Sequence, residues 1–314
     1  MKLLVTRALT PQVEARVAAE FDTTFRNGTN PLTQDEAQEA LAAYDALLVT
    51  LGDKMTARAF AGAPRARIVA NFGVGYNHID VAAARAQGIV VTNTPGAVTD
   101  ATADIALTLI LMSARRAAAG ERFVRSGAWT GWTPTQFLGQ HVSGKTVGII
   151  GLGRIGKAIA RRCHYGFGMR VLFHNRSTVA DPGVPATQVD MDRLLAEADF
   201  VVVAVPAAPA THHLIGAAQL AQMQPHAHFI NIARGDIVDE AALIATLQAG
   251  EIGGAGLDVY EHEPDVPVAL RGLDNVTLLP HLGTAALEVR DSMGLMALDN
   301  LCAFRDGKTP PNAV

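Results

Sequence analysis

The segment GQHVSGKTVGIIGLGRIG, residues 139–156, contains two phosphate-binding patterns in succession. Residues 139–146 match G-x-x-x-x-G-K-[ST], the P-loop of ATPases and GTPases. Residues 151–156 match G-x-G-x-x-G, the turn of dinucleotide-binding sites. The two patterns imply different proteins, and the flanking sequence decides between them.

A P-loop follows a buried strand and opens a helix. The segment TPTQFLGQ before Gly144 is polar and contains Pro134, and the residues after Lys145, TVGII, are typical of a strand. The P-loop pattern therefore stands in the wrong context. An ATPase or GTPase is the third and weakest of the functions that the sequence suggests.

The second pattern stands in the right context, because TVGII precedes it and a helical pattern follows. Ile155, Ile159 and Cys163 recur at a spacing of four residues, as on one face of a helix. In such a turn the first glycine bends the chain, the second admits a pyrophosphate, and the third packs helix against strand. The sequence predicts these roles for Gly151, Gly153 and Gly156.

The bulk composition describes a globular chain of 314 residues, a length typical of about two domains. The net charge of −4 gives no basic footprint for nucleic acid or for a membrane surface. Met1 leads directly into a strand-like segment, and no apolar run is long enough to span a bilayer. Cys163 and Cys302 cannot form a disulfide framework. We expect a cytoplasmic protein.

Short apolar runs alternate with helix-compatible segments along the chain, the pattern of parallel βα units. Such units fill residues 1–93, and a second series begins at Lys145. Between them we expect one long helix over residues 100–119, with Thr99 as its N-cap. The predicted fold is α/β, with two doubly wound parallel-sheet domains of Rossmann or flavodoxin type and a cleft between them.

Three residues that could carry chemistry each follow a predicted strand: Arg234, Glu263 and His281. Ligands of such sheets bind at the carboxyl ends of the strands. An arginine there can hold a carboxylate through two hydrogen bonds, and a histidine beside a carboxylate can give or take a proton. Taken singly, these residues have structural alternatives: a surface cap, a loop charge and a helix-start residue.

Together the segments INIARGDIVDEAAL, GLDVYEHEP and LLPHLGTA resemble the D-isomer-specific 2-hydroxyacid dehydrogenases. NFGVGYNHID and GIVVTNTP are similar to the substrate domain of the same family, and the likeness runs from about residue 45 to 305. The family is one of NAD(P)-dependent oxidoreductases. The glyoxylate and hydroxypyruvate reductase branch is the most similar.

The resemblance implies roles for individual residues. His281 would protonate the carbonyl oxygen of the substrate, and Glu263 would stabilise the positive charge of His281. Arg234 would bind both the carboxylate and the carbonyl of the substrate. The backbone amides of Val74 and Gly75, in the turn FGVGYN, would bind the substrate carboxylate. An ordinary tight turn is compatible with that role.

The resemblance also implies a domain arrangement. Residues 1–98 and 286–314 would form the substrate domain, and 99–285 the dinucleotide-binding domain with a dimerisation arm. We expect a homodimer, in which Trp132 of the arm reaches the neighbouring subunit's active site. A dimer contact without a substrate role is the alternative for this tryptophan.

The residues at the end of the second strand of the dinucleotide domain predict the cofactor preference. NAD enzymes usually carry an acidic residue there. Here the sequence is Asn175-Arg176-Ser177, which lacks a carboxylate and offers a cation and a hydroxyl to a 2′-phosphate. We predict NADPH as the preferred cofactor and NADH as the second; Arg176 pointing to solvent is the alternative. The expected cofactor residues are Gly151, Leu152, Gly153, Arg154, Ile155, Gly156, Asn175, Arg176, Ser177, Ile232 and Asp258, the last with a loop-capping role as its alternative.

A metal site is not expected. His212 and His213 are adjacent, and His226 and His228 alternate on a strand, but no third ligand with recognised spacing accompanies them. The hydrolase pattern Gly-x-Ser-x-Gly is also absent.

The sequence thus predicts NAD(P)H-dependent reduction of small 2-keto acids to D-2-hydroxy acids: glyoxylate to glycolate and hydroxypyruvate to D-glycerate. Two alternatives remain: a reductase for 2-ketogluconate or aromatic pyruvates, and a non-catalytic NAD(P)H-sensing interaction protein of the same fold. Ala286 stands where relatives commonly have threonine, and this departure touches the geometry near His281.

Overall fold

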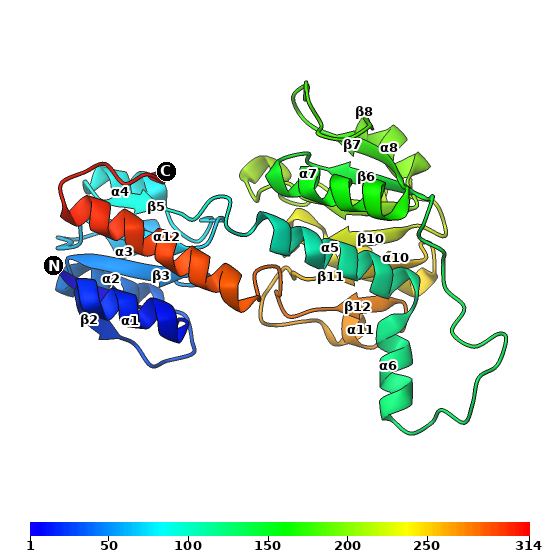
Figure 1. Ribbon diagram of the computed structural model, residues 1–314, viewed down its shortest axis with the longest axis horizontal. Coiled ribbons are helices and arrows are strands. Elements are labelled where there is room, and N and C mark those ends of the chain that lie inside the picture. The colour runs from blue at the N-terminus through cyan, green and yellow to red at the C-terminus, as the bar shows by residue number, and fades with distance from the viewer. The chain divides into compact units, whose positions relative to one another are not determined.

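The computed structural model describes residues 1–314, and the chain divides into two compact units. The first unit comprises residues 1–98 and 284–314, and the second comprises residues 99–283. Each unit is a parallel sheet with helices on both faces (Figure 1). The predicted α/β class with two parallel-sheet domains is confirmed. No helix combines the length and the apolar character needed to cross a membrane.

The first unit has the strand order β2-β1-β3-β4-β5, which is the flavodoxin-like order. Its strands are β1 (Lys2–Val5), β2 (Asp22–Phe25), β3 (Ala46–Thr50), β4 (Ile68–Phe72) and β5 (Val90–Thr92). Its helices are α1 (Pro11–Glu20), α2 (Gln34–Ala43), α3 (Ala57–Phe60), α4 (Val81–Ala86) and α12 (Leu287–Arg305).

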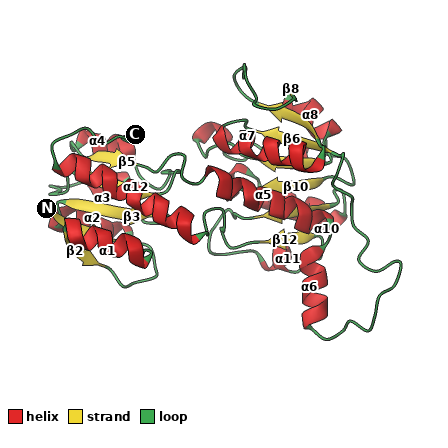
Figure 2. Ribbon diagram, in the orientation of Figure 1, coloured by secondary structure: helices red, strands yellow, loops and turns green.

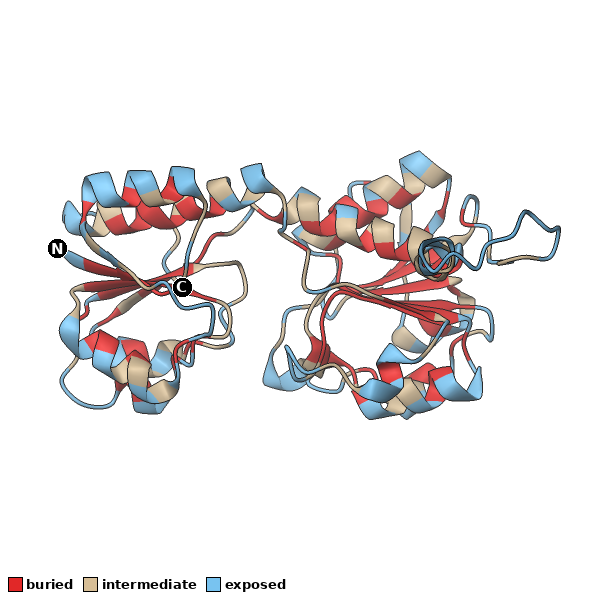
Figure 3. Cartoon of the chain, turned by 90° about the horizontal axis from the view of Figure 1, so that it is seen from below, coloured by how far each residue is buried: buried red, intermediate tan, exposed pale blue.

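Alternation along the strands divides the core of this unit into two layers, because successive side chains point to opposite faces of a sheet. Ala46 and Leu48 of β3 pack in the layer that contains α1 and α12. Leu47 and Val49 pack in the layer beneath α2, α3 and α4. Figure 3 shows these buried strands between helices whose outer surfaces are exposed. A strand buried on both faces needs a nearly continuous apolar run, which is the pattern of ALLV, residues 46–49.

The second unit has the strand order β12-β11-β10-β9-β6-β7-β8, which is the Rossmann order extended by one strand. Its strands are β6 (Thr146–Ile150), β7 (Arg170–His174), β8 (Ala186–Gln188), β9 (Phe200–Val203), β10 (His228–Asn231), β11 (Gly254–Leu257) and β12 (Val276–Leu278). Its α-helices are α5 (Thr99–Ala114), α6 (Ala117–Arg125), α7 (Arg154–Arg161), α8 (Met191–Glu197), α9 (Ala217–Leu220), α10 (Glu240–Ala249) and α11 (Val268–Arg271). A π-helical turn, Arg162–Gly166, extends α7, and single 3₁₀ turns cover Pro209–Thr211 and Gly235–Ile237.

The expected single helix over residues 100–119 is wrong, because α5 ends at Ala114 and α6 starts at Ala117. The carbonyl oxygen of Ala114 accepts a hydrogen bond from the Gln140 amide at 2.8 Å, and Arg116 adopts a left-handed φ of 51°. The chain that returns from the arm thus takes the place of the next helical turn. Figure 2 shows α6 and the long loop after it projecting from the second unit.

The two short strands β2 and β8 lack the apolar run by which the other strands are predicted from the sequence. Each is an edge strand with few buried residues, so the periodic apolar signal is weak there. Helix α12 packs on α1 and β4. Ala286 is its N-cap and makes no side-chain capping bond, so the departure from threonine removes a capping hydroxyl from this helix.

A buried carboxylate, Asp53, ties three segments of the first unit together after β3. It accepts hydrogen bonds from the Thr6 hydroxyl at 2.6 Å, the Leu32 amide at 2.7 Å and the Thr50 amide at 2.8 Å. Its side chain is fully buried. Removing it leaves buried donors without an acceptor, which is costly in a protein interior.

Asp53→Ala is therefore expected to destabilise the protein by roughly 3 kcal/mol and to lower the urea midpoint of the first unfolding transition by about 1 M or more. Asp22→Ala removes an exposed carboxylate from β2 of the same unit and serves as the control. Circular dichroism during urea titration measures both. Equal midpoints for the two variants would show that the Asp53 network contributes nothing.

Candidate active site

The glycine turn after β6 has the geometry that the second sequence pattern predicts. Gly151 has a φ of +99°, and a Cβ there would lie 2.7 Å from Val205 Cγ1 and 2.9 Å from the Ala204 oxygen. The Gly151 amide donates to the carbonyl oxygen of His174 at 2.9 Å, which joins the turn to the end of β7. Only glycine fits this position, at the point where the strand order reverses between β6 and β9.

The other two glycines differ in what surrounds them. A Cβ at Gly156 would lie 2.2 Å from the Gly151 oxygen, so α7 packs directly on the turn. A Cβ at Gly153 would meet nothing within 4 Å, so the amino end of α7 faces open space. This space and the free end of a helix suit a pyrophosphate. The P-loop pattern, in contrast, ends where strand β6 begins and opens no helix.

The residues at the end of β7 lie beside this turn. The Asn175 side-chain oxygen accepts a hydrogen bond from the Leu152 amide at 3.1 Å. Arg176 and Ser177 follow with exposed side chains. The structure therefore brings the predicted residues of the turn and of the β7 end together. Asn175 orders the glycine turn, and the exposed side chains of Arg176 and Ser177 are available to contact a ligand. Arg154 opens α7 with an exposed side chain, and Ile155 packs against the core.

The loops after three neighbouring strands carry the predicted chemical residues. Arg234 follows β10, Glu263 follows β11 and His281 follows β12. These strands are adjacent in the sheet, so their carboxyl ends meet at one edge. The Nδ1 atom of His281 lies 2.8 Å from Oε2 of Glu263. This hydrogen bond fixes the ring and leaves Nε2 as the nitrogen that can exchange a proton with a substrate.

Glu263 is held at both oxygens, since its Oε1 accepts a hydrogen bond from the Tyr260 amide at 3.1 Å. Burial raises the pKa of Glu263, but the hydrogen bond and charge of His281, together with Arg234, outweigh it and lower the pKa below its ordinary value. Glu263 is thus an anion that supports a positive charge on His281.

His281 itself is set by the chain around Asp258. It has a left-handed φ of 55°, and its amide donates to the Asp258 carbonyl oxygen at 3.0 Å. The Asp258 carboxylate accepts from the Leu282 amide at 2.6 Å and the Gly283 amide at 2.8 Å. Burial raises the pKa of Asp258. In this structure Asp258 therefore caps the turn that positions His281, which is the alternative role considered for it.

Arg234 is positioned by an asparagine that the sequence interpretation missed. Buried Asn231 accepts from the Ala233 amide at 3.0 Å and donates to the Arg234 carbonyl oxygen at 2.9 Å. Burial lowers the pKa of Arg234, and the carboxylates of Glu263 and Asp236 oppose this shift. A guanidinium remains protonated in proteins, so Arg234 is a cation of low hydration. Ile232, two residues earlier, is buried in the core.

The close contact of the loops after β10 and β11 depends on Gly235. A Cβ there would lie 1.8 Å from the Tyr260 carbonyl carbon and 2.2 Å from the Glu261 nitrogen. The backbone beside Arg234 therefore touches the backbone that leads to Glu263. Any side chain at residue 235 would separate the two loops.

The predicted carboxylate-binding turn lies in the first unit, after β4. The Asn71 side-chain amide donates to the carbonyl oxygens of Gly73 at 2.9 Å and Gly75 at 3.0 Å, and the Asn93 amide donates to Val74 at 2.8 Å. Three consecutive carbonyls are thus turned toward the protein, and the amides of Val74 and Gly75 donate to no protein group. Asn71 and Asn93 were missed because an asparagine at a strand end gives no specific sequence signal.

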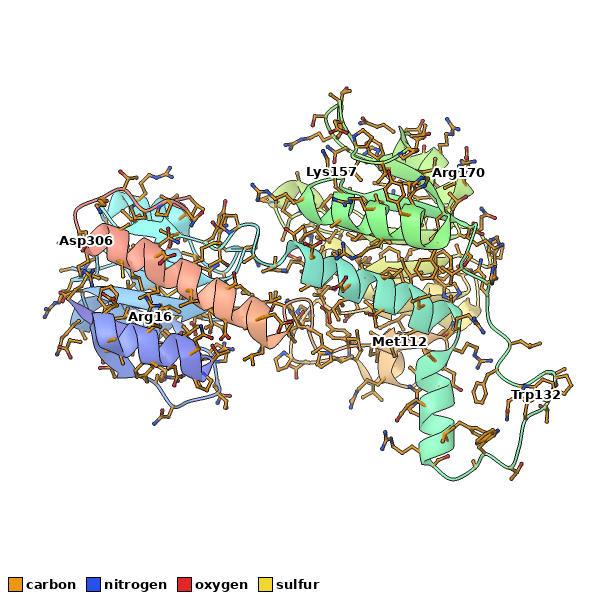
Figure 4. The ribbon with its side chains drawn as sticks, in the orientation of Figure 1. Arg16, Met112, Trp132, Lys157, Arg170 and Asp306 are labelled. Carbon is orange, nitrogen blue, oxygen red and sulfur yellow. The ribbon has the colours of Figure 1, made fainter.

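The arm of the second unit exposes large apolar side chains. Helix α6 has no buried residue, and the side chains of Trp129 and Trp132 are 52% and 79% exposed. Figure 4 shows Trp132 on the loop that projects beyond α6. Phe123 and Phe137 make an edge contact with ring centroids 5.2 Å apart, which joins α6 to the returning chain.

The histidines show one grouping that the sequence does not reveal. His226 pairs with Asp199 at 2.8 Å, and buried His228 contacts the Ser113 hydroxyl at 2.6 Å, so these two do not converge on one site. His212 and His213, however, meet Glu261, and one donor atom of each lies within 4.8 Å of the others. The fold thus brings a third potential ligand to these two histidines, although the sequence shows none at a recognised spacing. Glu261 is 48 residues away in the chain, beyond the reach of any local pattern.

A Rossmann sheet with a glycine turn, and an arginine and a histidine–glutamate pair at its carboxyl edge, define a nicotinamide-dependent oxidoreductase of hydroxy acids. Residues 107–283 match the family model described as D-isomer specific 2-hydroxyacid dehydrogenase, NAD binding domain. The chain belongs to this family, and the resemblance drawn from the sequence is confirmed.

Relatives and solved structures of similar proteins cover the whole chain. A glyoxylate reductase of Pyrococcus furiosus is 43% identical over 319 residues, spanning 100% of this chain and 95% of its own. Glyoxylate/hydroxypyruvate reductase B of Klebsiella pneumoniae is 40% identical over 99% of this chain and 97% of its own. The NADPH-dependent glyoxylate/hydroxypyruvate reductase of Sinorhizobium meliloti, solved with NADP and malonate, superposes with a TM-score of 0.87 at 37% identity, covering 100% of this chain and 96% of that one.

Gly235→Ala should separate the loops that carry Arg234 and Glu263 and lower kcat by about a hundredfold or more, because small misplacements of catalytic groups are costly. NADPH binding, measured by fluorescence, should change little. Gly166→Ala is the control, since a Cβ at Gly166 meets nothing within 4 Å. Wild-type kcat in Gly235→Ala would contradict the role assigned to this contact.

Proposed function

We propose that the protein reduces small 2-keto acids to D-2-hydroxy acids with NADPH, converting glyoxylate to glycolate and hydroxypyruvate to D-glycerate. The observation that carries the proposal is the 2.8 Å hydrogen bond between His281 and Glu263, at the same sheet edge as Arg234. Relatives that cover the whole chain bear the names glyoxylate reductase and glyoxylate/hydroxypyruvate reductase, which supports the substrate class.

His281 is the proton donor in the proposed reaction. Protonated His281 donates from Nε2 to the carbonyl oxygen of the keto acid as negative charge develops there, while Nδ1 remains bonded to Glu263. The carboxylate of Glu263 stabilises the cationic imidazole before transfer and keeps the ring oriented afterwards. Bound NADPH supplies the hydride to the keto carbon.

Arg234 binds the substrate carboxylate and polarises the carbonyl in this proposal. Its guanidinium presents two parallel donors to planar oxygens, and its low hydration strengthens the attraction. The amides of Val74 and Gly75 are the second set of carboxylate donors. Asn71 and Asn93 are positioning residues for them, because they fix the carbonyls that face the other way.

The preference for NADPH over NADH rests on the residues after β7. Exposed Arg176 and Ser177 offer a cation and a hydroxyl to a 2′-phosphate, and no carboxylate stands at residue 175 to repel it. Arg154 at the start of α7 adds a second cation near the glycine turn. The Sinorhizobium meliloti enzyme, described as NADPH-dependent, supports this preference.

A homodimer is part of the proposal. The arm exposes Val124, Trp129, Trp132 and Leu138, with 52–79% of each residue accessible. Exposed apolar side chains of this size are typical of a protein interface. Trp132 then contacts the partner's substrate site.

A cytoplasmic location is supported by the two free cysteines, of which Cys163 is buried with its pKa raised by burial to about 12.

Arg234→Ala should lower kcat/KM for glyoxylate by a factor on the order of a thousand or more, because a charged clamp is lost from a site of low hydration. Arg271→Ala, which removes an exposed arginine from α11 of the same unit, is the control. Steady-state NADPH oxidation measures both. Turnover of Arg234→Ala within a few-fold of the control would refute the assignment.

Arg176→Ala should raise the KM for NADPH by about tenfold or more and leave the KM for NADH nearly unchanged, since only NADPH carries the 2′-phosphate. The same Arg271→Ala control applies. A parallel loss for both cofactors would indicate a structural role for Arg176, and no loss for either would place its side chain in solvent.

A further inference from the structure

We propose that His212, His213 and Glu261 form a binding site for a divalent first-row transition metal ion, for which Zn²⁺ is the reference occupant. The proposal does not depend on the proposed function, because none of the three residues has a role in the keto-acid chemistry. The two histidines directly follow the 3₁₀ turn Pro209–Thr211 after β9, and Glu261 lies in the loop after β11.

The nitrogen and oxygen atoms that would bind the metal lie close together in the structure. One nitrogen or oxygen from each residue lies within 4.8 Å of the others. Nε2 of His213 and Oε1 of Glu261 are 2.9 Å apart. Two ligands on one ion at bonds of about 2.0–2.1 Å are separated by roughly 3 Å, so this pair can chelate with little movement.

The His212 ring supplies the third ligand. It stacks on the His213 ring with a centroid distance of 4.0 Å and an interplanar angle of 23°, and it is exposed to solvent. A rotation of this exposed side chain moves its nitrogen toward the other two atoms. Two imidazoles and one carboxylate, with the remaining positions open to water, form a recognised set of zinc ligands.

The local charge favours a cation. The Glu261 amide donates to Oε1 of Glu240 at 3.3 Å, so the two carboxylate residues are neighbours. Neither glutamate has a lysine or arginine within salt-bridge distance. A divalent ion would supply the missing positive charge.

A hydrogen bond alone explains His213 and Glu261 but not the adjacent ring of His212, which makes no hydrogen bond to the protein. The pair His226–Asp199 provides the matched comparison within the same unit. It is also an exposed histidine bonded to a carboxylate, at 2.8 Å, and it belongs to no group of three potential metal ligands. This pair is expected to bind metal no more tightly than an isolated histidine.

The test is titration of the metal-stripped, tag-free full-length protein with ZnCl₂ by isothermal calorimetry. We expect one saturable site with a Kd in the micromolar range, about −8 kcal/mol. His212→Ala and Glu261→Gln should each weaken binding by about tenfold or more, whereas His226→Ala should bind as the wild type does. Glu261→Gln retains a hydrogen-bond acceptor for His213, so it removes the anionic ligand while preserving the pair.

Thermal unfolding without metal shows whether each variant is folded, and with excess Zn²⁺ it gives a second readout. A ligand that binds only the native state raises Tm, and this shift should vanish in His212→Ala. Absence of saturable binding in the wild type, or wild-type affinity in either His212→Ala or Glu261→Gln, would overturn the site. These outcomes are independent of any keto-acid turnover.

Discussion

The hydrogen bond between His281 and Glu263 is the interaction on which the rest of the second unit's chemistry depends. It joins two loops that follow different strands. Asp258 caps the turn that carries His281, the Tyr260 amide orients Glu263, and Gly235 lets the neighbouring loop approach. The parallel sheet supplies the common edge, and these local contacts then set the atoms in position.

The strands of the sheets are easier to predict from the sequence than the loops and helix ends that connect them. Buried strands such as ALLVT and TVGII, and the turn GLGRIG, carry strong local signals, since each residue must satisfy one dominant constraint. The fold class and the placement of Arg234, Glu263 and His281 after strands followed from those signals. The break between α5 and α6 did not, because it depends on the Ala114 carbonyl meeting Gln140, which lies 26 residues later.

Contacts that form only in the folded loops account for the site features that were missed. The side chains of Asn71 and Asn231 donate to backbone carbonyls a few residues away, and that of Asn93 donates to the distant Val74 carbonyl. Glu261 joins His212 and His213 through the approach of two loops, so a ligand count along the chain could not find it. In each case the residue type is common, and its partner determines its role.

The most direct test of the central claim is NADPH oxidation, followed by absorbance and repeated with NADH, against glyoxylate, hydroxypyruvate, pyruvate, phenylpyruvate and 2-ketogluconate. The account predicts the highest kcat/KM for glyoxylate and hydroxypyruvate with NADPH. Tight binding of NADPH without turnover of any of these acids would contradict it and would favour a nucleotide-sensing role. Turnover led by phenylpyruvate or 2-ketogluconate would retain the chemistry of His281 and Glu263 and overturn the assigned substrate.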